Sequence, residues 1–324
     1  MEEIKYSIII PHHNIPDLLQ RCINSIPDSC GIQVIIVDDN SNPDIVDFAN
    51  FPGKDRQNVE VIFSKESGGA GHARNVGLQF AKGKWLLFAD ADDFFVDDML
   101  SILDNYYNSD ADCICFNISS VYSNDLSKPG YRSKKKLFDE YKKERNIDIF
   151  RLRYTEPWGK MIKRQLINEY GIKFDETEIA NDHYFSVHVG CVSKKIFAID
   201  IPLYIVTVRE GSLSYQLGDT REKLLIRIGV CIRVQRLMKK YGYVMRPMPL
   251  RSLMVILLKR YPRYFIMELF VLSFKTDISI CKLLIQMLLP KYYGHNNIKV
   301  TQSYILSRLN KIEIFNVLKY VENI

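Results

Sequence analysis

Residues 85–93, WLLFADADD, join a short apolar run to three closely spaced carboxylates. A glycine and a lysine come just before this run, so we expect a short buried strand that begins at a turn. Three carboxylates at the end of a buried strand would repel one another and be poorly solvated without a counter-charge. A bound divalent cation would supply that charge, and α/β sheets place ligands at strand ends. The alternative is a solvated acidic loop.

Three more apolar runs precede this one, and each stops at or shortly before proline, aspartate or glycine. They cover residues 6–10, 34–37 and 59–63. Helical spacing of apolar residues over 17–26 and 73–81 alternates with these runs. The alternation predicts a parallel sheet with right-handed crossovers, whose strand ends gather along one edge.

Composition describes a folded chain of one to three domains, with 47% hydrophobic and 25% charged residues. The start, MEEIK, is acidic and leads straight into a strand, so we expect no signal peptide. No run reaches the roughly 18 apolar residues of a spanning helix. The seven cysteines lack a Cys-x-x-Cys pair, which favours reduced thiols over disulfides or zinc. We predict a cytoplasmic protein without a nucleic-acid partner.

Charge divides the chain into two parts. Residues 215–324 contain 19 Lys and Arg against 6 Asp and Glu, a balance of +13, and residues 1–214 hold 25 against 32, a balance of −7. The basic part has helical patterns, and the segment 122–153 is rich in Lys, Ser and Asp. We interpret that segment as a mobile insertion or acceptor-side loop, or else as a solvated connector. The candidate helices lie near 219–241, 249–260, 262–274, 277–289 and 299–321.

Four strand-end motifs, in this order, resemble the nucleotide-sugar half of the family 2 inverting glycosyltransferases, whose fold is called GT-A. They are SIIIPHHN at 7–14, VDDNS at 37–41, GGAGHARNVG at 68–77 and DADD at 90–93. The resemblance covers residues 5–215, about two thirds of the chain. It implies an α/β domain over 1–214, with a mostly parallel sheet flanked by helices. Its Rossmann-like nucleotide-sugar half spans about 1–120 and its acceptor half 121–214, and the mainly helical region 215–324 lies beyond the resemblance.

The resemblance implies that Asp39 accepts a hydrogen bond from a uracil ring, which suits a carboxylate because it can only accept. Capping of a helix that starts near Asp44 is the alternative role. Pro11 stops the first strand, so that backbone groups near His13 line the base pocket. His13 stands where the family commonly has an aromatic residue.

The same resemblance implies that Asp92 binds Mg²⁺ or Mn²⁺ bridging the diphosphate, and that Asp90 contacts the ribose or the metal shell. Alternation along an extended segment points both side chains the same way, and an oxygen-only ligand set suits these hard cations. Arg74 would hold phosphate or base oxygens, or else buttress the acidic strand ends. Arg209, in the segment after the last strand, would meet the diphosphate.

An inverting transfer also needs a base that takes the proton of the acceptor hydroxyl. Residues 181–185, NDHYF, resemble the family's acidic-Asp-x-x-Phe pattern, with Asn181 in place of the acidic neighbour. The resemblance therefore implies Asp182 as the base, with a helix cap as its alternative role and His183 as a rival for proton transfer. Trp158 is expected to stack on an acceptor sugar or to pack as core.

The resemblance implies a metal-dependent hexosyl- or N-acetylhexosaminyltransferase that takes the sugar from a nucleoside-diphosphate sugar, with UDP as the first expectation. It also implies a glycan or lipid-linked acceptor of surface-polysaccharide or capsule synthesis. Two alternatives are a non-catalytic sugar-nucleotide-binding subunit and a sugar nucleotidyltransferase, whose glycine-rich loop is missing after the first strand. The basic tail would dock on the inner face of the cytoplasmic membrane, or pack on the catalytic domain or on a second copy in a homodimer.

Overall fold

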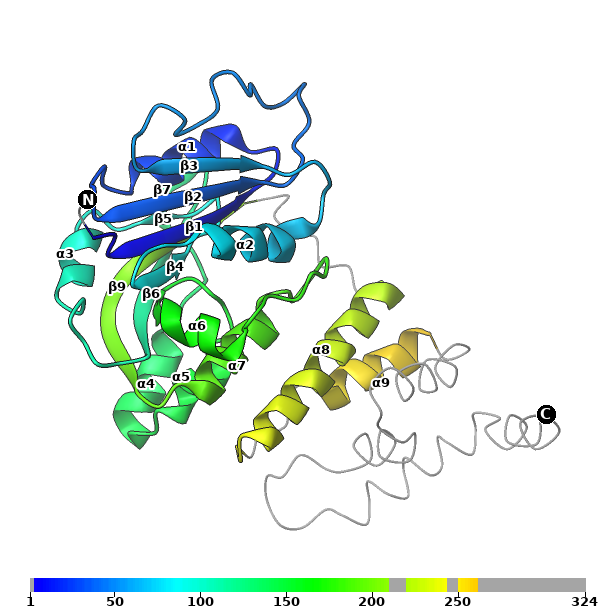
Figure 1. Cartoon of the computed structure of the whole chain (residues 1–324). Helices are drawn as coiled ribbons and strands as arrows, with labels where there is room; N and C mark the ends of the chain where they lie inside the picture. Colours follow the sequence, from blue (N-terminus) through cyan, green and yellow to red (C-terminus); the bar gives the residue numbers. More distant parts are fainter. Residues whose placement is uncertain (1–2, 210–219, 244–249, 262–324) are drawn as a thin grey trace, which may run out of the picture. The chain divides into compact units, whose positions relative to one another are not determined.

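The computed structural model describes residues 3–209, 220–243 and 250–261, and the chain falls into two compact units. The first unit contains residues 1–219 and 236–243, and the second contains 220–235 and 244–324. Figure 1 shows the whole chain. The predicted domain boundary at 214/215 lies outside the described residues.

The first half of the sheet is parallel, as predicted. Its strands are β1 (Tyr6–His12), β2 (Ile32–Asp38), β3 (Val59–Phe63) and β4 (Trp85–Phe88), in the order β3-β2-β1-β4. In register, Ile8 of β1 lies between Val34 and Leu87. The chain moves outward from β1 to β3 and then back to β4. Right-handed crossovers therefore place α1 (Pro16–Asn24) and α2 (Gly69–Phe80) on opposite faces of this half.

The second half of the sheet is mixed rather than parallel. β8 (Lys160–Lys163) is antiparallel to both β4 and β6 (Cys113–Tyr122), and β6 runs parallel to β9 (Ile196–Val208). Two short strands complete the sheet: β5 (Phe94–Phe95) on β9 and β7 (Asp125–Pro129) on β6, both antiparallel. The sequence predicted the parallel half because its strands alternate with helices, whereas the mixed half depends on contacts between distant segments.

Segment 122–153 is largely regular structure, in contrast to the predicted loop or connector. After β7 it forms α4 (Lys135–Glu144) and α5 (Asp148–Arg153). The few apolar side chains in this polar stretch are the ones that pack: Phe138 and Phe150 are both buried, with ring centroids 4.6 Å apart. Because the segment is mostly polar, its sequence pattern did not predict that these two aromatic side chains pack together.

Three further helices complete the first unit: α3 (Met99–Asp104), α6 (Arg164–Tyr170) and α7 (His183–Val192). Beyond them, α8 (Arg221–Lys240) and α9 (Leu250–Arg260) agree with the predicted helices near 219–241 and 249–260. The other three predicted helices lie outside the described residues. None of the helices that the structure describes is long and apolar enough to span a membrane.

Candidate active site

The carboxyl ends of the parallel strands meet at one edge of the sheet, as the sequence predicted. Backbone hydrogen bonds join each strand end to the next: Asp39 donates to His12, Ala89 to Ile9 and Ser64 to Asp38, at 2.8, 3.1 and 2.9 Å. The four sequence motifs therefore share this edge. The structure brings together Pro11, His13, Asp39, Asp90 and Asp92 along it.

A buried network under this edge was missed by the sequence analysis. His12 Nδ1 lies 2.7 Å from Asp38 Oδ1, and the amide of Ile15 donates to His12 Nε2 at 3.2 Å. In this arrangement Nε2 accepts a hydrogen bond from the backbone and Nδ1 donates one to Asp38. Burial opposes ionisation of Asp38, but hydrogen bonds from His12 and Ser41 outweigh it and lower the pKa of Asp38.

Asp39 faces the start of α2. Its carboxylate accepts hydrogen bonds from the Ser67 hydroxyl and from the amides of Gly68 and Gly69, each at 2.8 Å. These amides belong to the first turn of a helix that has no side-chain cap of its own, so Asp39 satisfies its orphan donors and its positive dipole end. Residues near Asp44 form turns rather than the helix considered from sequence. His13 lies beside Asp39, with Nδ1 3.0 Å from the Asp39 carbonyl oxygen.

Arg74 links the acidic strand end to the segment before α7. Its guanidinium donates to Asp90 Oδ1 at 2.5 Å and to Asn181 Oδ1 at 2.9 Å, and it lies over the Phe174 ring at 5.4 Å. Arg74 is only 5% exposed. This is the buttressing arrangement, the second of the two roles considered for Arg74. It also places Asn181, where an acidic residue was the family pattern, as a neutral acceptor for the guanidinium.

Asp92 and Asp93 lie where burial and neighbouring carboxylates disfavour negative charge. Burial and the neighbouring Asp90 raise the pKa of Asp92, although Arg209 Nε donates to its Oδ2 at 3.0 Å. Burial and the charge of Asp92 raise the pKa of Asp93, whose Oδ1 accepts the Thr207 amide at 2.7 Å. Asp93 is therefore tied to β9 through Thr207. Within the described ranges no group of three or more His, Cys, Asp or Glu side chains gathers as a self-sufficient metal site.

Asp182 is the residue at the N-cap of α7, but its side chain makes no capping hydrogen bond. Asp182 therefore occupies the position of a helix cap, its alternative role, but its carboxylate is not used for capping. Burial raises its pKa to about 6, with Arg74 lowering it and Glu156 raising it further. Burial lowers the pKa of His183 to about 4. At neutral pH Asp182 is ionised and is the stronger base of the two.

Trp158 packs as core, the second of its two predicted roles. It is 6% exposed, and its ring stacks on Tyr204 at 5.9 Å with an interplanar angle of 18°. A ring face covered in this way leaves no room for an acceptor sugar. The Tyr204 hydroxyl in turn accepts the backbone amide of Asp90 at 2.8 Å. Trp158 thus supports the acidic motif 90–93 indirectly, through Tyr204 in its apolar strand.

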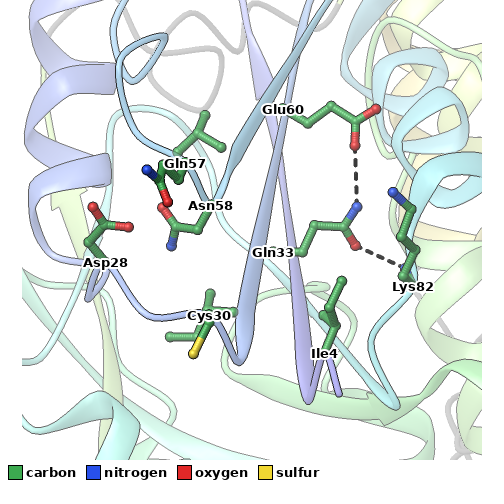
Figure 2. Close-up of a pocket in the computed structure, with 10 residues that line it drawn as sticks. Ile4, Asp28, Cys30, Gln33, Gln57, Asn58, Glu60 and Lys82 are labelled. Atoms are coloured by element: carbon green, nitrogen blue, oxygen red, sulfur yellow. Dashed lines mark hydrogen bonds between the residues drawn. The ribbon is translucent and has the colours of Figure 1, made fainter. Parts of the chain in front are cut away.

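A cavity of about 590 Å³ opens at the opposite edge of the sheet, where β1, β2 and β3 begin (Figure 2). Gln33 lies in its wall, donating to Glu60 at 3.3 Å and accepting the Lys82 amide at 2.9 Å. The residues predicted from sequence to act on a sugar nucleotide do not line this cavity. The predicted residues lie instead at the edge formed by the carboxyl ends of the parallel strands.

Known proteins resemble this chain in sequence and in fold. The chain is 29% identical over 216 residues to the poly(ribitol-phosphate) beta-glucosyltransferase of Bacillus spizizenii, covering 64% of this chain and 33% of that protein. It is 26% identical to glycosyltransferase GlyA of Streptococcus pneumoniae serotype 4, covering 65% of this chain and 31% of that protein. The match thus spans about a third of the length of these two relatives.

A solved structure with the same fold is S. aureus TarS 1–349 in complex with UDP-GlcNAc, with a TM-score of 0.61 and 20% sequence identity. The comparison covers 88% of this chain and 79% of that one. The sequence model of glycosyl transferase family 2 matches residues 7–171, just over half of the 324 residues and including the four strand-end motifs. Since motifs, fold and family model agree over this region, the chain belongs to glycosyl transferase family 2.

Proposed function

We propose that this protein transfers a sugar from a UDP-sugar to a hydroxyl group of a glycan or lipid-linked acceptor, with inversion at the anomeric carbon and with Asp182 as the base. The observation that carries this proposal is the bridge made by Arg74, whose guanidinium contacts both Asp90 and Asn181. Asp90 belongs to the donor motif and Asn181 directly precedes Asp182. A single buried side chain thus connects the donor edge to the base.

Asp182 has the properties that the proton transfer needs. In the proposed step, the acceptor oxygen forms a bond to the anomeric carbon as the carbon–oxygen bond to the diphosphate breaks, and that electron pair leaves with UDP. The hydroxyl proton passes to the Asp182 carboxylate. A pKa of about 6 keeps the carboxylate ionised at neutral pH, yet makes it a stronger base than an ordinary aspartate. The missing capping bond leaves its oxygens available.

The strand-end carboxylates fit a divalent cation. Magnesium and manganese sites at sugar or nucleoside diphosphates use one or two carboxylates, with substrate phosphates and water as the remaining ligands. Burial and the neighbouring Asp90 raise the pKa of Asp92, so a nearby cation would stabilise its ionised form, and its donor atoms are oxygens alone. Asp92, with Asp90 beside it, would hold Mn²⁺ or Mg²⁺. The ion would act as a Lewis acid toward the charge on the departing diphosphate.

Asp39 keeps one acceptor position for a base. A carboxylate offers about four lone-pair sites, and three are directed at Ser67, Gly68 and Gly69. One remaining acceptor suits the single ring N–H of uracil, whereas guanine presents two adjacent donors. Pro11 and His13 belong to the same pocket by position. This supports UDP over GDP.

The proposed acceptor follows from the names of two relatives. Two relatives are named as acting on poly(ribitol-phosphate), the Bacillus spizizenii enzyme and TarS of Staphylococcus aureus. A polyol-phosphate polymer is therefore the first acceptor to try, ahead of neutral glycans. With Trp158 buried, the sugar-stacking surface has to come from other residues. Tyr131, which is 66% exposed and precedes the basic run 132–136, is the first aromatic side chain to test for this role.

Binding and turnover test this function separately. Melting temperatures of the full chain are measured with UDP-glucose, UDP-GlcNAc and GDP-mannose, each with Mn²⁺, and UDP-sugars are expected to stabilise it. Release of UDP from the stabilising donor is then followed with and without ribitol-phosphate polymer. Asp92→Asn and Asp182→Asn are expected to lose transfer by about a hundredfold or more while remaining folded. Full transfer in either variant would remove that residue from its role. Donor binding without transfer under all conditions would favour the non-catalytic subunit.

A further inference from the structure

The two carboxylates of the metal motif are each paired with an arginine, and the two pairs differ in kind. Arg74 pairs with Asp90 from a buried position, with a second bond to Asn181 and the face of Phe174 beneath it. Arg209 pairs with Asp92 through Nε at 3.0 Å, and its side chain is 29% exposed against 6% for Arg74. One pair is built into the fold, and the other lies at its rim.

This difference decides which pair can open. Separating Arg74 from Asp90 would leave a buried guanidinium without its counter-charge, which is strongly unfavourable. Separating Arg209 from Asp92 leaves side chains that are 29% and 21% exposed, which water hydrates in part, so the loss is smaller. Asp92 therefore exchanges its arginine partner more easily than Asp90, whose arginine is only 6% exposed.

Geometry makes Arg209 a direct competitor for a cation at Asp92. Its Nε occupies Oδ2, and the Asp92 carbonyl oxygen is already taken by Arg21 at 2.5 Å and by the Thr207 hydroxyl at 2.8 Å. The Asp92 side chain is the part of this residue that can exchange partners. The Asp93 carboxylate cannot replace it, because it is buried against Thr207.

We propose that Arg209 is a stand-in cation that neutralises Asp92 in the donor-free protein, leaves it when a divalent cation binds there, and then pairs with the incoming diphosphate. Asp90 stays bonded to Arg74 through Oδ1 throughout, so Asp92 is the motif carboxylate that changes partner when the cation binds. This inference rests on the proposed metal-dependent use of a sugar nucleotide. It adds that Arg209 opposes metal binding before the donor arrives and favours it afterwards.

The test is Mn²⁺ affinity of the full chain, measured by the electron paramagnetic resonance signal of free Mn²⁺, first without nucleotide and then with UDP. Arg209→Gln is expected to bind Mn²⁺ about two- to fivefold tighter than wild type without nucleotide, because the competing charge is gone. With UDP present it is expected to bind Mn²⁺ about tenfold more weakly, because the diphosphate has lost a charged partner. The proposal therefore predicts that Arg209→Gln strengthens Mn²⁺ binding without nucleotide and weakens it with UDP.

Two further variants separate the specific pair from general charge. Arg209→Lys keeps a cation beside Asp92 and is expected to retain near wild-type Mn²⁺ affinity without nucleotide. Lys128→Gln removes the same charge from exposed β7, where Lys128 lies over the Tyr122 ring, and is expected to leave both affinities unchanged. Melting temperatures confirm that each variant is folded.

The outcomes distinguish this inference from the function on which it rests. If Mn²⁺ binds with UDP but Arg209→Gln fails to tighten binding of Mn²⁺ alone, the stand-in role is wrong and the proposed function survives. An equal tightening in Lys128→Gln would also overturn it, since general charge would then explain the effect. If no form of the protein binds Mn²⁺ even with UDP, the metal-dependent function fails, and this inference fails with it.

Discussion

Two adjacent residues, Asp182 and His183, show how environment assigns chemistry at the scale of a residue. Burial penalises the charged form of both side chains, which is the deprotonated form of aspartate and the protonated form of histidine. For the aspartate this raises the pKa to about 6, and for the histidine it lowers the pKa to about 4. The carboxylate becomes a better base and the imidazole a worse one. Residue type alone would have favoured the histidine.

The raised pKa of Asp182 predicts opposite effects of pH on activity and stability. Transfer needs the ionised carboxylate, so kcat/KM is expected to fall about tenfold per pH unit below about pH 6. For stability, the folded pKa lies above the ordinary value of 3.8, so the favourable contribution is complete below pH 3.8 and disappears as the pH rises through about 6. Above that pH the buried charge is destabilising.

Asp182→Asn is therefore expected to be inactive and yet more stable than wild type at pH 8, by about 1 to 3 kcal/mol. Urea unfolding at pH 8 and at pH 4 measures this, and the gain should vanish at the lower pH. A stability gain over wild type of the same size at both pH values would contradict the assignment of the raised pKa to Asp182.

Helix α2 organises the site at the scale of an element. Its first turn is bonded to Asp39, and Arg74 in its middle reaches Asp90 and Asn181. Close packing allows this reach, because a Cβ on Gly71 would lie 2.0 Å from the Asp175 carbonyl oxygen and 3.0 Å from Asn181 Cβ. The glycine is needed for the close approach of segment 175–181, which leads to Asp182, the proposed base.

Gly71→Ala is expected to push the segment 175–181 outward, lowering transfer by tenfold or more and destabilising the fold by about 1 to 3 kcal/mol through overpacking. Steady-state kinetics and urea unfolding measure the two effects. Gly229→Ala is the matched control in helix α8, where the nearest atom to the new Cβ is the flexible Arg233 Nη1 at 3.9 Å. It should be neutral or stabilising, since alanine favours helix. Wild-type transfer and stability in Gly71→Ala would contradict the claim that the close approach requires glycine.

At the scale of the whole molecule, the charge balance of −7 over residues 1–214 and +13 over 215–324 remains the most unusual property. Within the described residues, α8 and α9 end in Lys239–Lys240 and Lys259–Arg260, and both helices carry apolar side chains along most of their length. A basic helical region of this kind suits an anionic surface. The alternative partners are the catalytic unit and a second copy of the chain.

The full chain is expected to sediment with vesicles containing about one third phosphatidylglycerol in low salt, and to be released by about 0.5 M NaCl, since screening weakens this attraction. Neutral phosphatidylcholine vesicles are the control lipid. Absence of sedimentation with anionic vesicles would contradict the membrane interpretation. Light scattering of the same samples without lipid reports whether the chain forms a homodimer.

Local patterns predicted the parallel half of the sheet, the two described helices of the basic region and the motifs that gather at the carboxyl edge. They succeeded because buried parallel strands are continuous apolar runs, and because their ends must lie at one edge once the order of elements is known. The mixed half and the helices of segment 122–153 were missed. There the pattern is polar, and only a few aromatic anchors such as Phe138 and Phe150 decide the packing.

The sequence by itself therefore determined the architecture of the first half and the identity of the candidate residues, since both depend on neighbours along the chain. Only the tertiary structure decided their partners: Asp39 with the start of α2, Arg74 with Asp90 and Asn181, and Trp158 against Tyr204. Arg209 and Asp92 are 117 positions apart. Contacts of that kind arise when packing brings distant segments together, and burial then sets the charge each side chain can carry.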